Sequence, residues 1–425
     1  MAATDAGGYA GAAHTRRHGG PSCMAAENAL DDAPTVVLPR VDLPVQPTVS
    51  SRRDTTPVAA RPSVNRLYVL DGLRFLAALS VVGFHVIADY GNRNTWGRPA
   101  AEVFGPAVLD VFEYGWLGVE CFFVISGFVI CMSCWGRTVS EFAISRVTRL
   151  MPAYVFAVLV TSAALFLFPL PDGRPRVSDV LVNTTMLQQF FGIRGVDFVY
   201  WTLFEELKFY LLFAVLAYFG LTYRRVILFC FVWMAAALYG QYTNFAPVAK
   251  TVSSEYASYF VAGILLYLIY RFGPNLLLLG GFAVAIVTTV PSLIKRVSFH
   301  SNGKHIISFD VAFVIMLCFF LLMLAVALGW LASVRWRALT VVGALTYPLY
   351  LLHMQLGRII VHRIHDVVSP WILVAGLVVG FVAFAYVVQR FVERPVARML
   401  RVRLRESFAQ IRVADRNDRQ SAPAG

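Results

Sequence analysis

Charged side chains are scarce in this sequence. Asp, Glu, Lys and Arg make up 15% of its 425 residues, whereas hydrophobic residues make up 58%. A soluble domain carries about 25% charged residues and cannot hide so much apolar surface from water. The scarcity of charge therefore excludes an ordinary soluble fold and indicates an integral membrane protein.

Cysteine is also sparse, with six residues in the chain. One pair, Cys131-x-x-Cys134, has the spacing of a zinc or redox motif. No second pair stands at ligand spacing in the sequence, and this pair closes an apolar run. We therefore expect buried, inert thiols and no metal site.

The chain has too few acidic residues to balance its basic ones, and its formal net charge is +12. Arg residues crowd the two ends, before the first apolar run and after the last. This pattern is typical of cytoplasmic flanks beside a membrane, and we expect no nucleic-acid partner. The residues concerned are Arg52, Arg53, Arg61, Arg66, Arg394, Arg398, Arg401, Arg403 and Arg405.

From Leu67 onward, apolar runs recur at the length that a bilayer requires, roughly 20 residues. The sequence predicts an all-α integral membrane protein, a polytopic bundle of about ten transmembrane helices. Lys and Arg in the loops favour neither side, but the basic tails and an even number of spans place both termini in the cytoplasm. The predicted spans are 67–88, 116–135, 150–170, 202–220, 224–240, 256–272, 275–292, 309–330, 338–360 and 371–391.

Three segments follow from these runs. Residues 1–65 are polar, lack apolar periodicity and are expected to form a disordered cytoplasmic tail. Residues 66–393 form the transmembrane domain. Residues 394–425 are expected to form a basic, loosely attached cytoplasmic tail.

Ionisable residues inside membrane spans are costly and mark functional sites. In the first span, Arg74 and His85 are eleven residues apart, which places them about 20° apart on one helix face and about 16.5 Å apart along the axis. Asp71 precedes Arg74 by three residues and is positioned to pair with it. An interfacial Arg and an isolated His are the plainer interpretation, but the shared stripe favours function.

Two further clusters flank the second and third spans. Glu120 begins the second span, and Ser126 belongs to a Ser-Gly step within it, which fits either a functional site or close helix packing. Arg146 and Arg149 lie three residues apart just before the third span. Planar guanidinium groups suit phosphate binding, although an ordinary cytoplasmic anchor has the same appearance.

The fourth span opens with Trp201 and carries Glu205, Glu206 and Lys208 within about one turn. Glu205 and Lys208 are spaced to pair, which leaves Glu206 on another face. An interfacial collar with Trp201 in the aromatic belt is the alternative. A last polar residue, His353, lies in the outer half of the ninth predicted span.

Taken together, these segments resemble acyltransferase family 3, the membrane-bound bacterial glycan O-acyltransferases. The resemblance covers residues 67–400 and keeps the order of the family's motifs. They are Arg74-x10-His85, Gly-Val-Glu-x-Phe-Phe-Val-Ile-Ser-Gly at 118–127, Ser-Arg-x-x-Arg-Leu-x-Pro-Ala-Tyr at 145–154, Trp-Thr-Leu-x-x-Glu-x-x-Phe-Tyr at 201–210, Tyr-Pro-Leu-Tyr-Leu-Leu-His at 347–353 and Val-Glu-Arg-Pro at 392–395.

The resemblance implies an enzyme of the bacterial cytoplasmic (inner) membrane that transfers an acyl group, usually acetyl, to a sugar hydroxyl. Acyl-CoA would be its co-substrate, with no permanently bound cofactor. Its other partners would be a glycan or lipid-linked sugar acceptor and the bilayer. Neither the acceptor nor the acyl chain follows from the residues.

The predicted topology suggests a split site. Arg74, Arg146 and Arg149 would bind acyl-CoA phosphates near the cytoplasmic face. His85 would act as general base or covalent acyl carrier, with Glu206 orienting it. Supporting or acceptor-contacting roles would fall to Asp71, Glu120, Ser126, Trp201 and His353.

A transporter or flippase of a glycan or small molecule is the alternative, because it too combines many spans with intramembrane charges. Transporters often show two similar halves with matching broken helices, and no such internal match is visible in this sequence.

Overall fold

The computed structural model describes residues 67–89, 95–243, 245–301 and 306–421, and within those ranges every regular element is a helix. The predicted disordered tail, 1–65, lies outside the described residues. The main helices are α1 (Tyr68–Gly83), α3 (Ala100–Phe104), α4 (Pro106–Phe112), α5 (Gly118–Cys134), α6 (Val139–Leu167), α7 (Val177–Asn183), α8 (Trp201–Tyr218), α9 (Tyr223–Tyr242), α10 (Ala246–Thr251), α11 (Ala257–Phe272), α12 (Leu276–His300), α13 (Phe309–Ala327), α14 (Ala338–Ile364), α15 (Pro370–Val388) and α16 (Arg394–Ser421).

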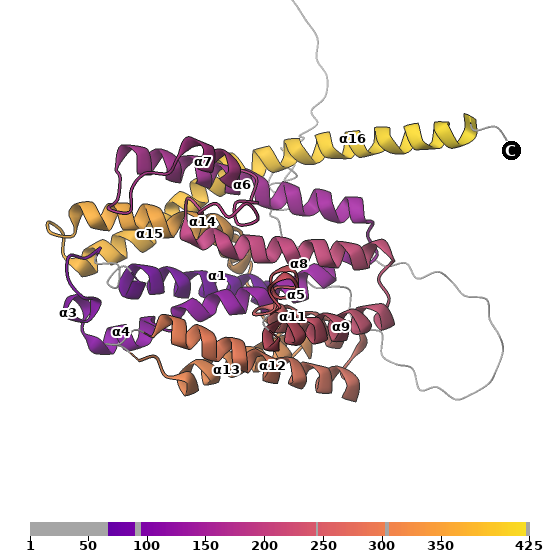
Figure 1. Cartoon of the computed structure of the whole chain (residues 1–425), viewed down its shortest axis with the longest axis horizontal. Coiled ribbons are helices and arrows are strands. Elements are labelled where there is room, and N and C mark those ends of the chain that lie inside the picture. Colours follow the sequence, from indigo (N-terminus) through magenta and orange to yellow (C-terminus); the bar gives the residue numbers. More distant parts are fainter. Residues whose placement is uncertain (1–66, 90–94, 244, 302–305, 422–425) are drawn as a thin grey trace, which may run out of the picture. The chain divides into compact units, whose positions relative to one another are not determined.

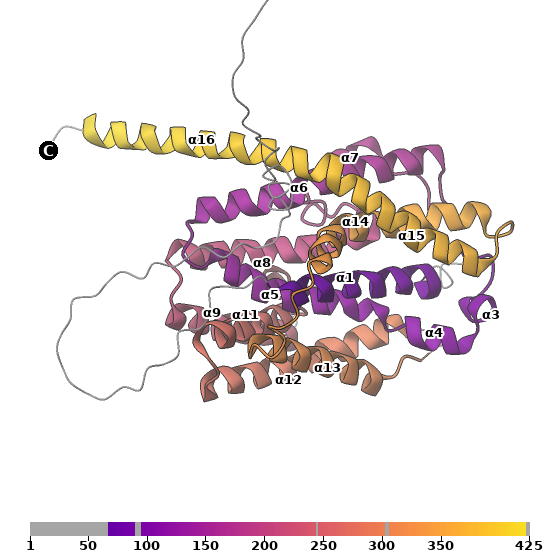
Figure 2. The same ribbon diagram turned by 180° about the vertical axis from the view of Figure 1, so that it is seen from behind.

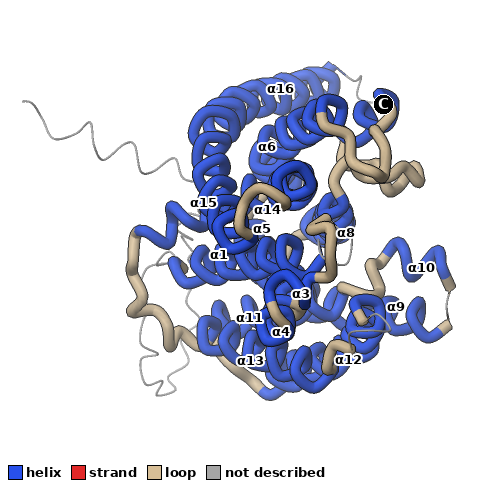
Figure 3. Tube along the Cα trace, turned by 90° about the vertical axis from the view of Figure 1, so that its left-hand side faces the viewer, coloured by secondary structure: helices blue, strands red, loops and turns tan. Residues whose placement is uncertain are grey.

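The long helices lie side by side, and α1, α5, α11 and α14 occupy the middle of the bundle (Figures 1 and 2). Helix α5 packs against both α1 and α11, while α14 packs against α1, α6 and α15. A view along the bundle shows the other long helices around this group (Figure 3). The motif-bearing segments therefore meet in the interior of the bundle.

Eight helices of the described chain are long and apolar enough to cross a membrane. The other two predicted spans are also helical, as α8 and α11. Helix α8 is not apolar enough to count with these eight because Glu205, Glu206 and Lys208 lie in its first half. Helix α11, with 16 residues, is shorter than the roughly 20 residues that a bilayer requires. The all-helical membrane fold is confirmed, while the count of ten and the cytoplasmic termini stay predictions.

The small-residue step in the second predicted span brings two helices into backbone contact. A Cβ atom added to Gly127 on α5 would overlap the carbonyl oxygen of Phe260 on α11. A Cβ atom added to Gly263 on α11 would likewise overlap the carbonyl oxygen of Val124 on α5. Small residues allow this approach between membrane helices, so the close-packing interpretation of the Ser-Gly step holds for its glycine.

Two helices change to π geometry at motif positions. Helix α1 continues into the π-helix η1 (Phe84–Asp89), and α15 continues into η4 (Gln389–Glu393). A π-turn widens the helix and re-aims its side chains, and it is found most often at functional sites. The first of these π-turns carries His85.

The basic C-terminal segment is helical as far as Ser421, and its first part is attached to the bundle. Helix α16 follows η4 directly and packs against α6 with its first part, and Figure 1 shows it continuing past the neighbouring helices. The half-buried residues Leu400, Leu404 and Phe408 recur every four positions. This spacing gives α16 an apolar stripe, which explains why it forms a helix despite its many charges.

Candidate active site

Most of the predicted site residues line one or more of three neighbouring cavities. The arginine cavity, of about 80 Å3, contains Arg74, Arg146, Arg149 and Glu206. The histidine cavity, of about 350 Å3, contains His85. The loop cleft, of about 530 Å3, is formed mainly by residues 172–198, between α6 and α8.

The three cavities adjoin one another. Val119 and Tyr350 line both the arginine cavity and the histidine cavity. Trp201 and Arg296 line both the histidine cavity and the loop cleft. His85 therefore lies between a strongly basic compartment and a polar cleft on the other side.

In the arginine cavity, α1 supplies Arg74 and α6 supplies Arg146 and Arg149. Arg146 is buried, and its Nη2 donates a hydrogen bond to Ser145 at 3.0 Å. Its Nε is also buried but has no hydrogen-bond partner in the described part of the chain. A buried donor without a protein partner is rare, and this one is positioned to bond to a ligand.

Glu206 belongs to this cavity and not to the surroundings of His85. The Ser126 hydroxyl on α5 donates a hydrogen bond to Glu206 Oε1 at 2.5 Å. The charges of Glu206 and Asp71 both act on Arg74. The predicted pairing of Glu205 with Lys208 is confirmed at 2.8 Å, and it leaves Glu206 on the inner face of α8 as expected.

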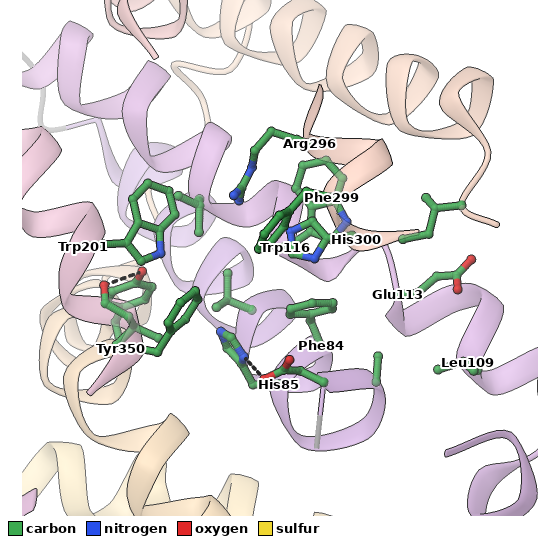
Figure 4. Close-up of a pocket in the computed structure, with 17 residues that line it drawn as sticks. Phe84, His85, Leu109, Glu113, Trp116, Trp201, Arg296, Phe299, His300 and Tyr350 are labelled. Carbon is green, nitrogen blue, oxygen red and sulfur yellow. Dashed lines mark hydrogen bonds and ion pairs between the residues drawn. The ribbon is translucent and has the colours of Figure 1, made fainter. Parts of the chain in front are cut away.

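The carboxylate beside His85 is Asp89. Its Oδ2 lies 3.3 Å from His85 Nδ1, one turn later in the same π-helix (Figure 4). The structure therefore does not bring Glu206 to His85, which the predicted orienting role of Glu206 requires, and places Asp89 there. Helix α8 begins beside the histidine cavity with Trp201, but Glu206 lies about 7.5 Å further along the axis and faces the arginines.

His353 lies next to His85, as the predicted topology required, with 5.3 Å between the ring centroids. It is fully buried, and its Nδ1 lies 2.9 Å from the carbonyl oxygen of Tyr350. It is not among the described residues that line the histidine cavity. The structure therefore places His353 beside the imidazole of His85, and its supporting or acceptor-contacting role stays a prediction.

Glu120 and Trp201 meet at Arg296, which is not among the predicted site residues. Arg296 Nε donates a hydrogen bond to Glu120 Oε1 at 3.2 Å, and the guanidinium lies 5.2 Å from the ring of Trp201. Arg296 had been assigned to a loop, because the seventh span was expected to end at residue 292. Helix α12 instead continues to His300, which carries Arg296 into the interior.

The other residues that sequence reasoning missed are Asp89 and His300. Asp89 stands four residues after His85, a spacing that places both on one helix face and was available as a signal. His300 stacks on Trp116 with 4.8 Å between ring centroids, and nothing in its sequence surroundings predicted that contact. Cys131 and Cys134 are buried and form no disulfide, as expected.

Comparison with known proteins agrees with this arrangement. The acyltransferase MdmB of Streptomyces mycarofaciens is 30% identical over 161 residues, which is 36% of this chain and 40% of that protein, so the match spans less than half of the relative's length. No solved structure matches the chain. The family model described as an acyltransferase domain matches residues 67–390, which include every predicted site residue. The chain therefore belongs to acyltransferase family 3.

Proposed function

We propose that this membrane acyltransferase moves an acyl group, with acetyl as the default, from acyl-CoA to a hydroxyl of a cell-envelope or secreted glycan. The observation that carries the proposal is the His85–Asp89 pair, in a cavity that adjoins the arginine cavity on one side and the loop cleft on the other.

The arginine cavity suits the phosphates of the donor. Three guanidinium groups and one carboxylate among its lining residues give a surplus of two positive charges. Arginine binds phosphate through paired N–H groups, and a partly buried site strengthens that attraction. A donor bound there would extend its pantetheine arm past Val119 and Tyr350, so that the thioester reaches His85.

The imidazole is arranged for general-base chemistry. With Nδ1–H donating to Asp89, His85 Nε2 takes the proton from the acceptor hydroxyl as its oxygen attacks the thioester carbonyl. The C–O bond forms, the C–S bond breaks, and the departing CoA thiolate takes the proton back from His85. The acceptor would approach from the loop cleft, where polar side chains and Trp201 are available to hold a sugar.

The test uses membranes that contain the protein, radiolabelled acetyl-CoA and cell-envelope glycan. Wild type should place base-labile label in the glycan, and His85→Ala should lower the rate by about 10²–10⁴-fold. His362→Ala, at an exposed position on α14, is the matched control and should keep wild-type activity. An active His85→Ala enzyme would overturn the base role, and wild type that transfers neither acetyl nor succinyl label would overturn the acyl-CoA and glycan assignments.

A further inference from the structure

The last turn of α12 brings two polar side chains, Arg296 and His300, into the histidine cavity. They are four residues apart and therefore lie on one face of the helix. Figure 4 shows both on the opposite side of the cavity from His85. Neither has a part in the chemistry described so far.

Arg296 is held rigidly on three sides. Its Nε is bound by the fully buried Glu120, and its guanidinium lies 5.3 Å from the ring of Trp116 and 5.2 Å from that of Trp201. Aromatic rings near a guanidinium restrain its plane, and its N–H groups point along that plane. No oxygen of the described chain accepts a hydrogen bond from the two Nη groups, so they remain available to a ligand.

His300 is held in a similar way. Its ring stacks on Trp116 with an interplanar angle of 20° and meets Phe84 edge to face at 5.3 Å. Its Nε2 is buried and has no hydrogen-bond partner in the described part of the chain. Such an atom in the wall of a cavity is positioned to form a hydrogen bond with a bound molecule.

The charge of this pair distinguishes it from the arginine cavity. Glu120 neutralises Arg296, so that this wall offers hydrogen-bond donors without a surplus of positive charge. Neutral, oxygen-rich groups suit such a wall, whereas phosphates suit the surplus around Arg74. Arg296 also lines the loop cleft, from which the acceptor would enter.

We propose that Arg296 and His300 bind the acyl acceptor and fix its orientation. The Arg296 Nη groups donate to two neighbouring oxygens of an uncharged polyhydroxyl acceptor, and His300 Nε2 hydrogen-bonds a further hydroxyl. This holds the reacting hydroxyl toward His85. The inference rests on the proposed function and adds to it the residues that select the acceptor.

The experiment measures initial rates of acetyl transfer twice, once against the concentration of acetyl-CoA and once against that of the glycan fraction. Arg296→Lys removes the planar guanidinium group and its paired N–H donors. It keeps a positive charge beside Glu120, so that this buried carboxylate is not left without a cation. His300→Phe keeps the aromatic stacking and removes Nε2. Lys295→Ala is the matched control, because Lys295 is 69% exposed and pairs with Glu255 outside the cavity.

Each cavity variant should raise the half-saturating glycan concentration about tenfold and leave that of acetyl-CoA within about twofold. Lys295→Ala should change neither. Equal loss toward both substrates, or loss toward acetyl-CoA alone, would overturn the inference while the proposed function stands. Absence of transfer by wild type would instead overturn the proposed function and the inference with it.

The folding of the variants is checked separately. Detergent-solubilised variants should elute like wild type in size-exclusion chromatography. If His300→Phe has the same half-saturating glycan concentration as wild type, His300 does not belong to the acceptor site.

Discussion

The Nδ1 atom of His85 lies 3.3 Å from Oδ2 of Asp89, and both residues belong to one six-residue π-helix. The widened turn places the acid directly beneath the imidazole, while the nearest comparable acid on α8, Glu206, bonds to Ser126 instead. The site therefore contains two carboxylates in separate surroundings. One lies against the imidazole of His85 and the other belongs to the arginine cavity.

Asp89→Asn is expected to lower kcat by about 10–100-fold and to leave the KM for acetyl-CoA nearly unchanged. The amide would favour the wrong tautomer of His85 and could not stabilise its protonated form. Steady-state rates against acetyl-CoA provide the measurement. Asp366→Asn, at an exposed residue that pairs with half-buried His365, should behave as wild type. Wild-type kcat in Asp89→Asn would show that Asp89 does not assist the base.

Arg146→Ala and Arg149→Ala should each weaken CoA binding by about tenfold, because each removes a charged donor to a phosphate. Stabilisation of the purified protein against heat by increasing CoA concentrations measures this. Pantetheine, which lacks the phosphates, supplies the control and should stabilise wild type and both variants equally. If CoA binds both variants as tightly as wild type, the arginine cavity is not the phosphate site.

Ser126→Ala should destabilise the protein or weaken donor binding by about 1–3 kcal/mol, since it leaves the Glu206 carboxylate without its hydroxyl partner. Thermal unfolding and CoA binding can be measured on the same preparation. Ser133→Ala, on the same helix, is the comparison, because the Ser133 hydroxyl donates to the carbonyl of Ile130 one turn earlier and to no other group of the described residues. Equal effects of the two changes would show that the Ser126–Glu206 contact has no special role.

Gly127→Ala should destabilise the bundle by roughly 1–3 kcal/mol, because the new methyl group meets the backbone of α11. Gly376→Ala on α15 meets no atom within 4 Å and should be neutral or slightly stabilising, as alanine favours helix. Thermal unfolding in detergent compares the two. A Gly127→Ala protein as stable as Gly376→Ala would contradict the close contact of α5 with α11.

Much of the fold followed from hydropathy alone. The predicted spans coincide with helices because a chain in lipid must satisfy its backbone hydrogen bonds within each segment. Span ends were less certain, since apolar and polar residues mix there. Arg296 shows the consequence: placing the end of the seventh span at residue 292 removed it from consideration, whereas α12 continues to His300.

The family was also within reach of the sequence, because six motifs occur in order, and the match over residues 67–390 decides for an acyltransferase over the transporter alternative. The sequence predicted less well which residues line each cavity. The predicted topology grouped Arg74, Arg146 and Arg149, and the structure places all three in one cavity. It also paired Glu206 with His85, because the depth in the membrane at which α8 begins does not show which way Glu206 faces.

The sequence by itself determined an all-helical membrane protein and its family, and it singled out many of the candidate site residues, because these depend on local composition, spacing and motif order. Tertiary structure decided which acid lies beside which base. That depends on the π-turn after α1, the rotation of α8 about its axis and the length of α12, all set by packing between segments distant in the chain. Such rotations leave no trace in hydropathy, so only the folded bundle places Glu206 against Ser126 and Arg296 between Trp116 and Trp201.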